Sequence, residues 1–329
     1  EYRLGNVTYY FIDNEYYFKR PSLYGSYDDG ERYAYFCKAV MEMMPHIDFF
    51  PDILHCHDWQ TGMIPVFLKS TFATHSFYWD TKSIMTIHNL KFQGVWDIDH
   101  FIYNTNLPGY MFTPDKLEFK KDANMLKGGL VYADYITTVS ETYAEEIKTP
   151  YYGEQLDGLL CARSRSLRGI LNGIDYSVYN PETDPKIAVH YNEKNAVEKK
   201  KEAKRALQKE LGLPVDDSKF MIAIISRLTD QKGLDLVDWI TERIVDEFTQ
   251  FVIIGTGESR YEDMFRYYQG RFPDRVSANI FYSDALAHKL YAAADAMLVP
   301  SRFEPCGLTQ LISLRYGTVP IVRETGGLK

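Results

Sequence analysis

The sequence of 329 residues lacks long apolar runs, an excess of basic residues and closely spaced cysteine pairs. Without an apolar run long enough to cross a bilayer, we expect no membrane-spanning helix. A net charge of −8 argues against a nucleic-acid surface, which needs a basic stripe, so an anionic ligand would have to meet a local group of Lys and Arg. The scattered cysteines, which predict reduced thiols in a cytosol-like compartment, are Cys37, Cys56, Cys161 and Cys306.

Short apolar runs alternate with helical patterns along most of the chain. The runs that we interpret as buried strands are residues 52–56, 83–87, 135–139, 169–171, 220–225, 251–254, 279–282, 296–299 and 319–322. The helical patterns include residues 32–44, 193–210, 234–247 and 285–294. Continuous apolar strands separated by helices predict an α/β fold with parallel, doubly wound sheets.

The length of the chain predicts two domains, with the break after Leu171. The residues that follow, Asn172-Gly173-Ile174-Asp175, predict a turn, and a strand-free stretch covers residues 180–185. We therefore predict two Rossmann-like parallel-sheet domains, 1–171 and 172–329, that face a cleft. In such sheets ligands bind beyond the carboxyl ends of the strands.

Two cations follow the apolar run at 220–225. Arg227 and Lys232 lie just before a helix that is expected to begin near Gly233. A strand end, two cations and a helix N-terminus together favour a diphosphate site. An exposed loop with incidental charges is the alternative. Gly255-Thr256-Gly257 also follows a strand, but it lacks the third glycine of a dinucleotide-binding loop.

A second loop of this kind follows the run at 296–299. It carries Glu304 and then a helix start, where the amides of Gly307, Leu308 and Thr309 would be free to bind phosphate oxygens. Glu304 could accept hydrogen bonds from sugar hydroxyls, or it could simply cap the helix. A carboxylate beside an anion site favours a hydroxyl-rich ligand.

Polar residues also end two strands in the first half of the chain. His88 ends one of them, although a lone histidine is more often structural than catalytic. His55 and His57 lie on one face of the other strand, but no further ligand set at suitable spacing supports a metal site. Asp58 and Trp59 offer a carboxylate for hydroxyls and an aromatic face for a sugar ring.

Six segments, in this order, resemble the glycogen synthase and bacterial or plastid starch synthase family. They are 52–59 (DILHCHDW), 86–89 (TIHN), 162–166 (ARSRS), 171–175 (LNGID), 226–233 (SRLTDQKG) and 302–309 (RFEPCGLT). The resemblance implies a GT-B glycosyltransferase that transfers glucose from ADP-glucose to the non-reducing end of an α-1,4-glucan with retention. It further implies that no cofactor and no metal is needed, and that the protein acts in the bacterial cytoplasm or the plastid stroma.

The resemblance also implies roles for individual residues. Arg227 and Lys232 match the residues that hold the donor phosphates and stabilise the leaving diphosphate. Glu304 matches the carboxylate that binds the glucose hydroxyls, and His88 matches the residue beside the reacting sugar. The other matches are Asp58 and Asn89 on the sugar side, Trp59 toward the acceptor, Tyr282 on the donor base, Gly307, Leu308 and Thr309 at the phosphates, and Asn172 at the hinge.

The sequence also departs from the family pattern. The Lys-x-Gly-Gly-Leu loop that opens the family is absent, and the sequence stops at residues 325–329, where the family continues. We therefore expect a chain truncated at both ends. A non-catalytic glucan-binding protein, or another sugar-nucleotide enzyme of the same fold, is an alternative. The oligomeric state does not follow from the sequence.

Overall fold

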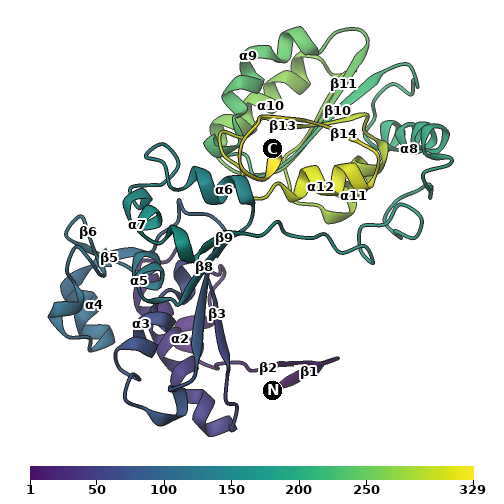
Figure 1. Ribbon diagram of the computed structural model, residues 1–329. Coiled ribbons are helices and arrows are strands. Elements are labelled where there is room, and N and C mark those ends of the chain that lie inside the picture. The colour runs from purple at the N-terminus through teal and green to yellow at the C-terminus, as the bar shows by residue number, and fades with distance from the viewer. The chain divides into compact units, whose positions relative to one another are not determined.

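Two parallel β-sheets organise the chain, one in each of the units Glu1–Ile170 and Leu171–Lys329 (Figure 1). The computed structural model describes every residue from 1 to 329. Successive strands pair in parallel because helices and long loops return the chain to the same end of the sheet. No helix has both the length and the apolar character needed to cross a membrane.

The first unit contains a four-stranded parallel sheet of order β3-β4-β8-β9. These strands are β3 (Ile53–His57), β4 (Lys82–Ile87), β8 (Tyr135–Thr138) and β9 (Leu167–Gly169). The α-helices are α1 (Glu15–Phe18), α2 (Asp29–Met43), α3 (Met63–Lys69), α4 (Ile98–Thr105), α5 (Met125–Tyr132), α6 (Glu141–Glu146) and α7 (Asp157–Ala162). The 3-10 helices are η1 (Met44–Ile47), η2 (Trp59–Thr61), η3 (Ser76–Tyr78), η4 (Gly109–Met111) and η5 (Ser164–Ser166).

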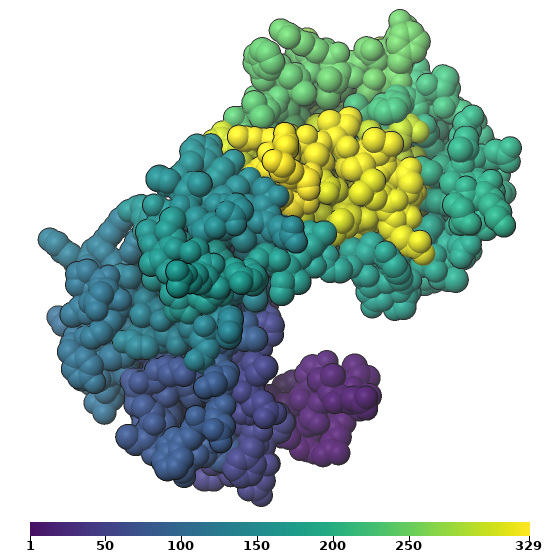
Figure 2. Space-filling view, in the orientation of Figure 1, coloured from purple at the N-terminus to yellow at the C-terminus, as the bar shows by residue number.

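Two small antiparallel sheets complete the first unit. Their strands are β1 (Tyr2–Leu4), β2 (Val7–Tyr9), β5 (Val95–Asp97), β6 (Glu118–Phe119) and β7 (Asp122–Asn124). The β1–β2 hairpin projects from the body of the unit (Figure 2), and Tyr2, Leu4 and Val7 are all more than half exposed. The β5-β7-β6 sheet instead packs near α4, and it contributes Trp96 to the rim of the core.

The second unit contains a five-stranded parallel sheet of order β12-β11-β10-β13-β14. Its strands are β10 (Phe220–Ile225), β11 (Thr249–Ile254), β12 (Val276–Asn279), β13 (Ala296–Val299) and β14 (Val319–Val322). The helices are α8 (Ala196–Glu210), α9 (Leu234–Ile244), α10 (Ser259–Arg271), α11 (Asp284–Ala293), α12 (Leu308–Arg315), η6 (Asp230–Lys232) and η7 (Gly326–Leu328).

Both faces of this five-stranded sheet are buried. Helices α11 and α12 lie on one side of the sheet and α9 and α10 on the other (Figure 1). In β10, Met221 and Ala223 pack with residues of α8, α11 and α12, whereas Ile224 packs with residues of α9 and α10. Burying one large aliphatic side chain stabilises a fold by roughly 1.5–3 kcal/mol, so this alternation holds the sheet from both sides. The strands themselves are therefore apolar, and polar residues gather in the loops at their ends.

Two strands lie earlier in the chain than the sequence predicts. The strand expected at 279–282 is β12, because its parallel pairing with β11 stops where Asn279 lies opposite Ile254. Aromatic residues favour strands, but Tyr282 lies beyond this pairing in a loop and is 86% exposed. Similarly, the strand expected at 169–171 is β9, which covers Leu167–Gly169 and so begins and ends two residues earlier.

Candidate functional site

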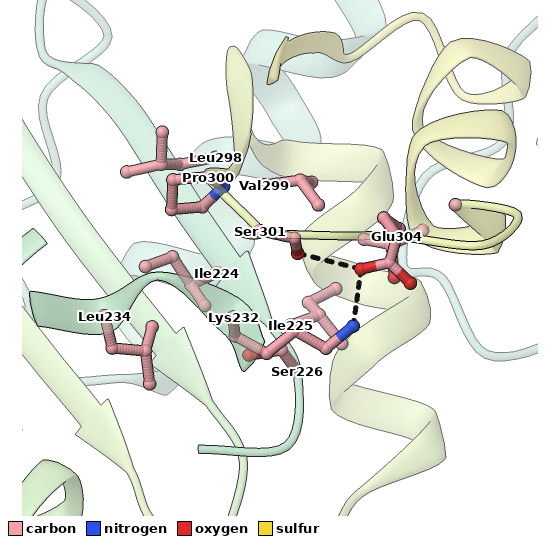
Figure 3. A pocket seen from close by; sticks show the side chains of 12 residues that line it. Ile224, Ile225, Ser226, Lys232, Leu234, Leu298, Val299, Pro300, Ser301 and Glu304 are labelled. Carbon is pink, nitrogen blue, oxygen red and sulfur yellow. Dashed lines mark hydrogen bonds and ion pairs between the residues drawn. The ribbon is translucent and has the colours of Figure 1, made fainter. Parts of the chain in front are cut away.

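Lys232, Ser301 and Glu304 meet beyond the carboxyl ends of β10 and β13 (Figure 3). Lys232 Nζ lies 2.6 Å from Glu304 Oε2, and Ser301 Oγ donates a hydrogen bond to the same oxygen at 2.8 Å. The side chains of Lys232 and Glu304 are only 16% and 13% exposed, so water screens their ion pair weakly. Two donors thus fix one carboxylate oxygen in a narrow pocket.

Helix α12 begins directly after this loop and has no side-chain cap. Gly307 is its N-cap residue, so the amides of Gly307, Leu308 and Thr309 have no acceptor within the helix. The helix dipole adds a partial positive charge at the same place, and together these groups favour an anion. The alternative that Glu304 caps this helix is wrong, because its carboxylate is bound by Lys232 and Ser301 instead.

The last loop of the second unit supports the backbone of Glu304. Gly327 N donates a hydrogen bond to Glu304 O at 2.9 Å. A Cβ on Gly326 would lie 2.0 Å from that same carbonyl oxygen, and Gly326 has a φ of 50°, so only glycine fits here. The sequence alone indicates no role for this segment, because no local pattern shows which distant loop a glycine pair will contact.

A second pocket, of about 230 Å³, adjoins the first. Ile225 and Ser226 line both pockets, and Arg227 and Tyr282 line the second. Ser226 Oγ is buried and has no hydrogen-bond partner. An unsatisfied buried hydroxyl costs about 1–3 kcal/mol, so a ligand that bonded it would recover part of that cost. The exposed ring of Tyr282 is available for stacking at the mouth of this pocket.

Gly255-Thr256-Gly257 packs against the loop that carries Arg227. A Cβ on Gly255 would lie 1.9 Å from Ser226 O, and Leu228 N donates a hydrogen bond to Thr256 O at 2.9 Å. The glycines therefore let two strand-end loops touch backbone to backbone. This contact positions Ser226 and Arg227, whereas the sequence offered only an incomplete dinucleotide motif.

In the first unit, Asp58 supports the loop that follows β4. Its Oδ1 accepts hydrogen bonds from His88 N at 2.7 Å and from Asn89 N at 3.4 Å. Asp58 has a φ of 55° and a ψ of −171°, a conformation that is retained only where the surrounding contacts impose it and that clusters at functional sites. Burial raises the pKa of Asp58, while these backbone N–H groups oppose the rise.

Three imidazoles form a row beside Asp58. His57 Nδ1 lies 3.0 Å from His88 Nε2, and the rings of His55 and His57 are 4.2 Å apart. His55 Nε2 is bonded to Thr86 Oγ1 at 2.7 Å. Burial lowers the pKa of His57, and the neighbouring His55 and His88 lower it further. The contact with His57 therefore orients the His88 ring. No group of three metal-ligating side chains is arranged to hold an ion.

Trp59 is largely buried, with 8% of its surface exposed. Its ring packs at 4.9 Å from the ring of Tyr33 and at 5.2 Å from that of Trp96. The indole is therefore a wall of a pocket in the first unit rather than a free platform. Its part in binding an acceptor stays a prediction.

Asn172 lies beside Cys306 in the second unit. Its backbone and side chain both hydrogen-bond the Cys306 thiol, and burial raises the pKa of that thiol. This contact joins the start of the unit to the loop that carries Glu304. All four cysteines of the chain are free thiols.

These observations define a class of protein. Each of the two units is built on a parallel, doubly wound sheet, as in GT-B glycosyltransferases. The second unit also carries cations and an uncapped helix N-terminus at its strand ends. Residues 1–162 match the starch synthase catalytic domain, and residues 204–329 match the glycosyl transferases group 1. A glycogen synthase of Lachnospira eligens is 61% identical over 330 residues, which cover 100% of this chain and 69% of the relative. The chain belongs to the glycogen synthase and starch synthase family.

Solved structures agree with this assignment. The catalytic domain of starch synthase IV from Arabidopsis thaliana, bound to ADP and acarbose, is 36% identical with a TM-score of 0.88. The match covers 95% of this chain and 64% of that one. Sucrose-phosphate synthase from Thermosynechococcus elongatus shares the fold with a TM-score of 0.59 at 18% identity, over 94% of this chain and 65% of its own. The chain thus spans about two thirds of the length of these relatives.

Proposed function

We propose that the chain transfers glucose from ADP-glucose to the non-reducing end of an α-1,4-glucan and retains the anomeric configuration. The observation that carries this proposal is the Lys232–Glu304 pair, 2.6 Å apart, beside the uncapped N-terminus of α12. A nucleotide sugar needs a cation and amides for its phosphates and a carboxylate for its hydroxyls, and this strand-end group unites all three. The similar starch synthase IV domain was solved bound to ADP, which supports an adenosine nucleotide.

On this proposal, the two cations act on the leaving group. Lys232 and Arg227 stabilise the negative charge that develops on the departing diphosphate, and electrostatic stabilisation of this kind is usually the largest contribution to catalysis. The amides of the first turn of α12 bind phosphate oxygens. When the donor binds, the Lys232 ammonium moves its contact from Glu304 to phosphate, and the Glu304 carboxylate is then free for glucose hydroxyls.

On the first unit, the proposal assigns the sugar side to His88, Asp58 and Asn89. Asp58 holds the backbone of the loop through His88 N, while the His88 ring is oriented by His57. The acceptor hydroxyl attacks the face of the sugar from which the diphosphate leaves, so the configuration is retained. The proposal needs no cofactor and no metal, and the bacterial relative favours the bacterial cytoplasm over the plastid stroma.

A donor screen tests this function. The chain is incubated with glycogen primer and either ADP-glucose or UDP-glucose, and the glucose incorporated into glucan is measured. We expect transfer from ADP-glucose to be at least about tenfold faster, and we expect Lys232→Met to lose most of it because the leaving diphosphate loses its cation. The exposed Lys201→Met variant is the matched control. Binding of glycogen without transfer from either donor would contradict the proposal.

A further inference from the structure

A buried carboxylate of the second unit lies outside both donor-side pockets and has no part in the roles described above. Asp184 belongs to the segment that leads from Leu171 to α8, and it is only 2% exposed. An ionised carboxylate at such depth costs several kcal/mol unless hydrogen bonds compensate it. The partners of Asp184 therefore show what this side chain does.

Two helices share one oxygen atom of this carboxylate. His288 Nδ1, on α11, lies 2.7 Å from Asp184 Oδ2. Tyr316 Oη, at the C-terminal end of α12, donates a hydrogen bond to the same oxygen at 2.5 Å. Lys186 N donates to Asp184 Oδ1 at 2.9 Å, so both carboxylate oxygens are bonded. His288 and Tyr316 are themselves buried.

The charge of Asp184 strengthens these contacts. Burial by itself would raise the pKa of Asp184, but the hydrogen bonds from Tyr316 and His288 outweigh burial and lower that pKa below its usual value. An ionised carboxylate only accepts hydrogen bonds, so His288 Nδ1 carries the proton of its contact. Burial, followed by the effect of Asp184, raises the pKa of Tyr316, whose hydroxyl therefore keeps its proton. Hydrogen bonds to a charged acceptor are stronger than neutral ones.

Each of these two helices presents a different part of the proposed donor site. The residues around the start of α11 that line the pocket of Arg227 are Phe281, Tyr282, Ser283 and Ala287. His288 directly follows the last of them. Helix α12 begins with the free amides beside Glu304, and Tyr316 directly follows its last residue. Asp184 therefore connects the helix of the base pocket to the helix of the phosphate amides.

The segment that carries Asp184 is anchored on both helices. The ring of Tyr179 stacks on the ring of His288, with centroids 4.9 Å apart and an interplanar angle of 17°. Tyr191 Oη donates a hydrogen bond to Tyr316 O at 2.9 Å. Asp184 is thus held in place from both sides, as a connection of fixed length requires.

We propose that Asp184 is a positioning residue that holds α11 and α12 at the spacing at which one nucleotide diphosphate binds both with its base and with its phosphates. The inference rests on the proposed function for the identity of this ligand. Two half-sites gain from being joined in one ligand only when their spacing fits it. Loss of the Asp184 contacts should therefore weaken ligands that span both half-sites and spare ligands that occupy one.

Calorimetric titration of the whole chain with ADP, adenosine and pyrophosphate tests this inference. We expect Tyr316→Phe and His288→Leu each to raise the dissociation constant of ADP about tenfold, while those of adenosine and pyrophosphate change less than about twofold. His288→Asn should restore most of the affinity, because its Nδ2 can donate in place of Nδ1. Tyr267→Phe, which removes an exposed hydroxyl of α10, is the matched control.

Steady-state kinetics supply a second measurement that a general loss of stability would not reproduce. In Tyr316→Phe the KM for ADP-glucose should rise about tenfold while kcat changes less than about twofold, since no reacting group is altered. Because this variant removes a single hydroxyl, it decides the question if His288→Leu does not fold.

The outcomes separate this inference from the proposed function. Unchanged ADP affinity in Tyr316→Phe would overturn it. Equal losses of affinity for ADP, adenosine and pyrophosphate would overturn it too, because they would show damage within the half-sites rather than a change in their spacing. ADP affinity that depends on these residues in a chain that transfers no glucose supports the role of Asp184 and contradicts only the proposed function.

Discussion

Lys232 and Glu304 neutralise each other through a contact of 2.6 Å, although a donor would need the ammonium for phosphate and the carboxylate for sugar. Their shared position among strand-end loops keeps the pair shielded, with Ser301 holding the same carboxylate oxygen. Removing one partner from a shielded pair leaves the other unpaired and changes its affinity for ligands. Substitutions at this pair should therefore separate binding from turnover.

We expect Glu304→Gln to lower turnover with ADP-glucose by about 10²-fold or more, because the charge that orders the sugar is lost. Affinity for ADP should stay the same or increase, since the carboxylate no longer competes with phosphate for Lys232. Steady-state kinetics and ADP titration measure the two effects, with the exposed Glu324→Gln variant as control. A parallel loss of ADP affinity and turnover would contradict the assignment.

Ser226 offers a test in which stability and affinity change in opposite directions. Its buried hydroxyl has no partner, so Ser226→Ala should leave the free energy of unfolding unchanged or raise it slightly. Donor affinity should fall about two- to tenfold if the ligand bonds this hydroxyl. Denaturant unfolding and donor titration provide the measurements. Ser301→Ala is the contrasting variant, because that hydroxyl has a partner in Glu304 and its loss should destabilise.

At the scale of secondary-structure elements, a half-buried lysine of α8 joins two helices of the second unit. Lys200 Nζ donates hydrogen bonds to Ala292 O at 2.9 Å, near the end of α11, and to Tyr316 O at 3.2 Å, at the end of α12. It also bonds Thr318 Oγ1 at 2.8 Å. Burial lowers the pKa of Lys200 to about 7, and its protonated form complements the dipoles at the C-terminal ends of two helices. The opposite end of α12 carries the amides of the proposed phosphate site, so this contact helps to orient those amides.

We expect Lys200→Met to destabilise the second unit by about 3 kcal/mol, because several buried carbonyl groups lose their donor. Affinity for ADP should fall as well, since α12 loses an anchor. Thermal unfolding and ADP titration measure both changes. Lys201→Met removes an exposed lysine of the same helix and should change neither the stability of the unit nor the affinity for ADP. Equal effects of the two variants would refute the role of Lys200.

At the end of β3 in the first unit, His57 makes the stability of the fold depend on pH. The pKa of His57 is lower in the folded chain than in the unfolded chain. As the pH falls below about 6.5, the unfolded chain therefore binds more protons than the folded chain, and the free energy of unfolding decreases. The slope should stay below the ~1.4 kcal/mol per pH unit of one full proton, because the ring is partly solvated. We expect His57→Gln to flatten the dependence measured by unfolding at pH 7.5 and 5.5, and the exposed His46→Gln to leave it unchanged. A steeper slope in His57→Gln would contradict this.

At the scale of the whole molecule, each unit has its own hydrophobic core. One cluster of buried residues lies within the first unit, and two clusters on opposite faces of one sheet lie within the second. Because domains with separate cores usually unfold as units, the chain should show two thermal transitions.

Ligands should act on these transitions selectively. A ligand at 100 times its dissociation constant stabilises the unit it binds by about 2.7 kcal/mol. We expect ADP to raise only the transition of the second unit and maltoheptaose only that of the first, as followed by scanning calorimetry. A single transition that responds to both ligands would contradict this expectation.

Much of the fold could be predicted because its causes are local. Apolar runs such as 220–225 and 251–254 form strands since both faces of a parallel sheet are buried, and this favours continuous apolar residues. Where local preference was the only guide, the prediction failed, as at 279–282, because strand pairing depends on a partner. The short antiparallel sheets were not predicted either, since strands of two or three residues carry little pattern.

The sequence by itself determined the class of fold, the family, and the polar segments that end the strands. Only the tertiary structure decided which of these segments meet. Lys232 and Glu304 are 72 residues apart, and they touch because β10 and β13 are parallel neighbours whose carboxyl ends lie at one edge of the sheet. The contact of Gly326 with Glu304 and the pocket between Trp59 and Trp96 also join distant segments. Such contacts follow from strand order and loop packing, which no local pattern of residues specifies.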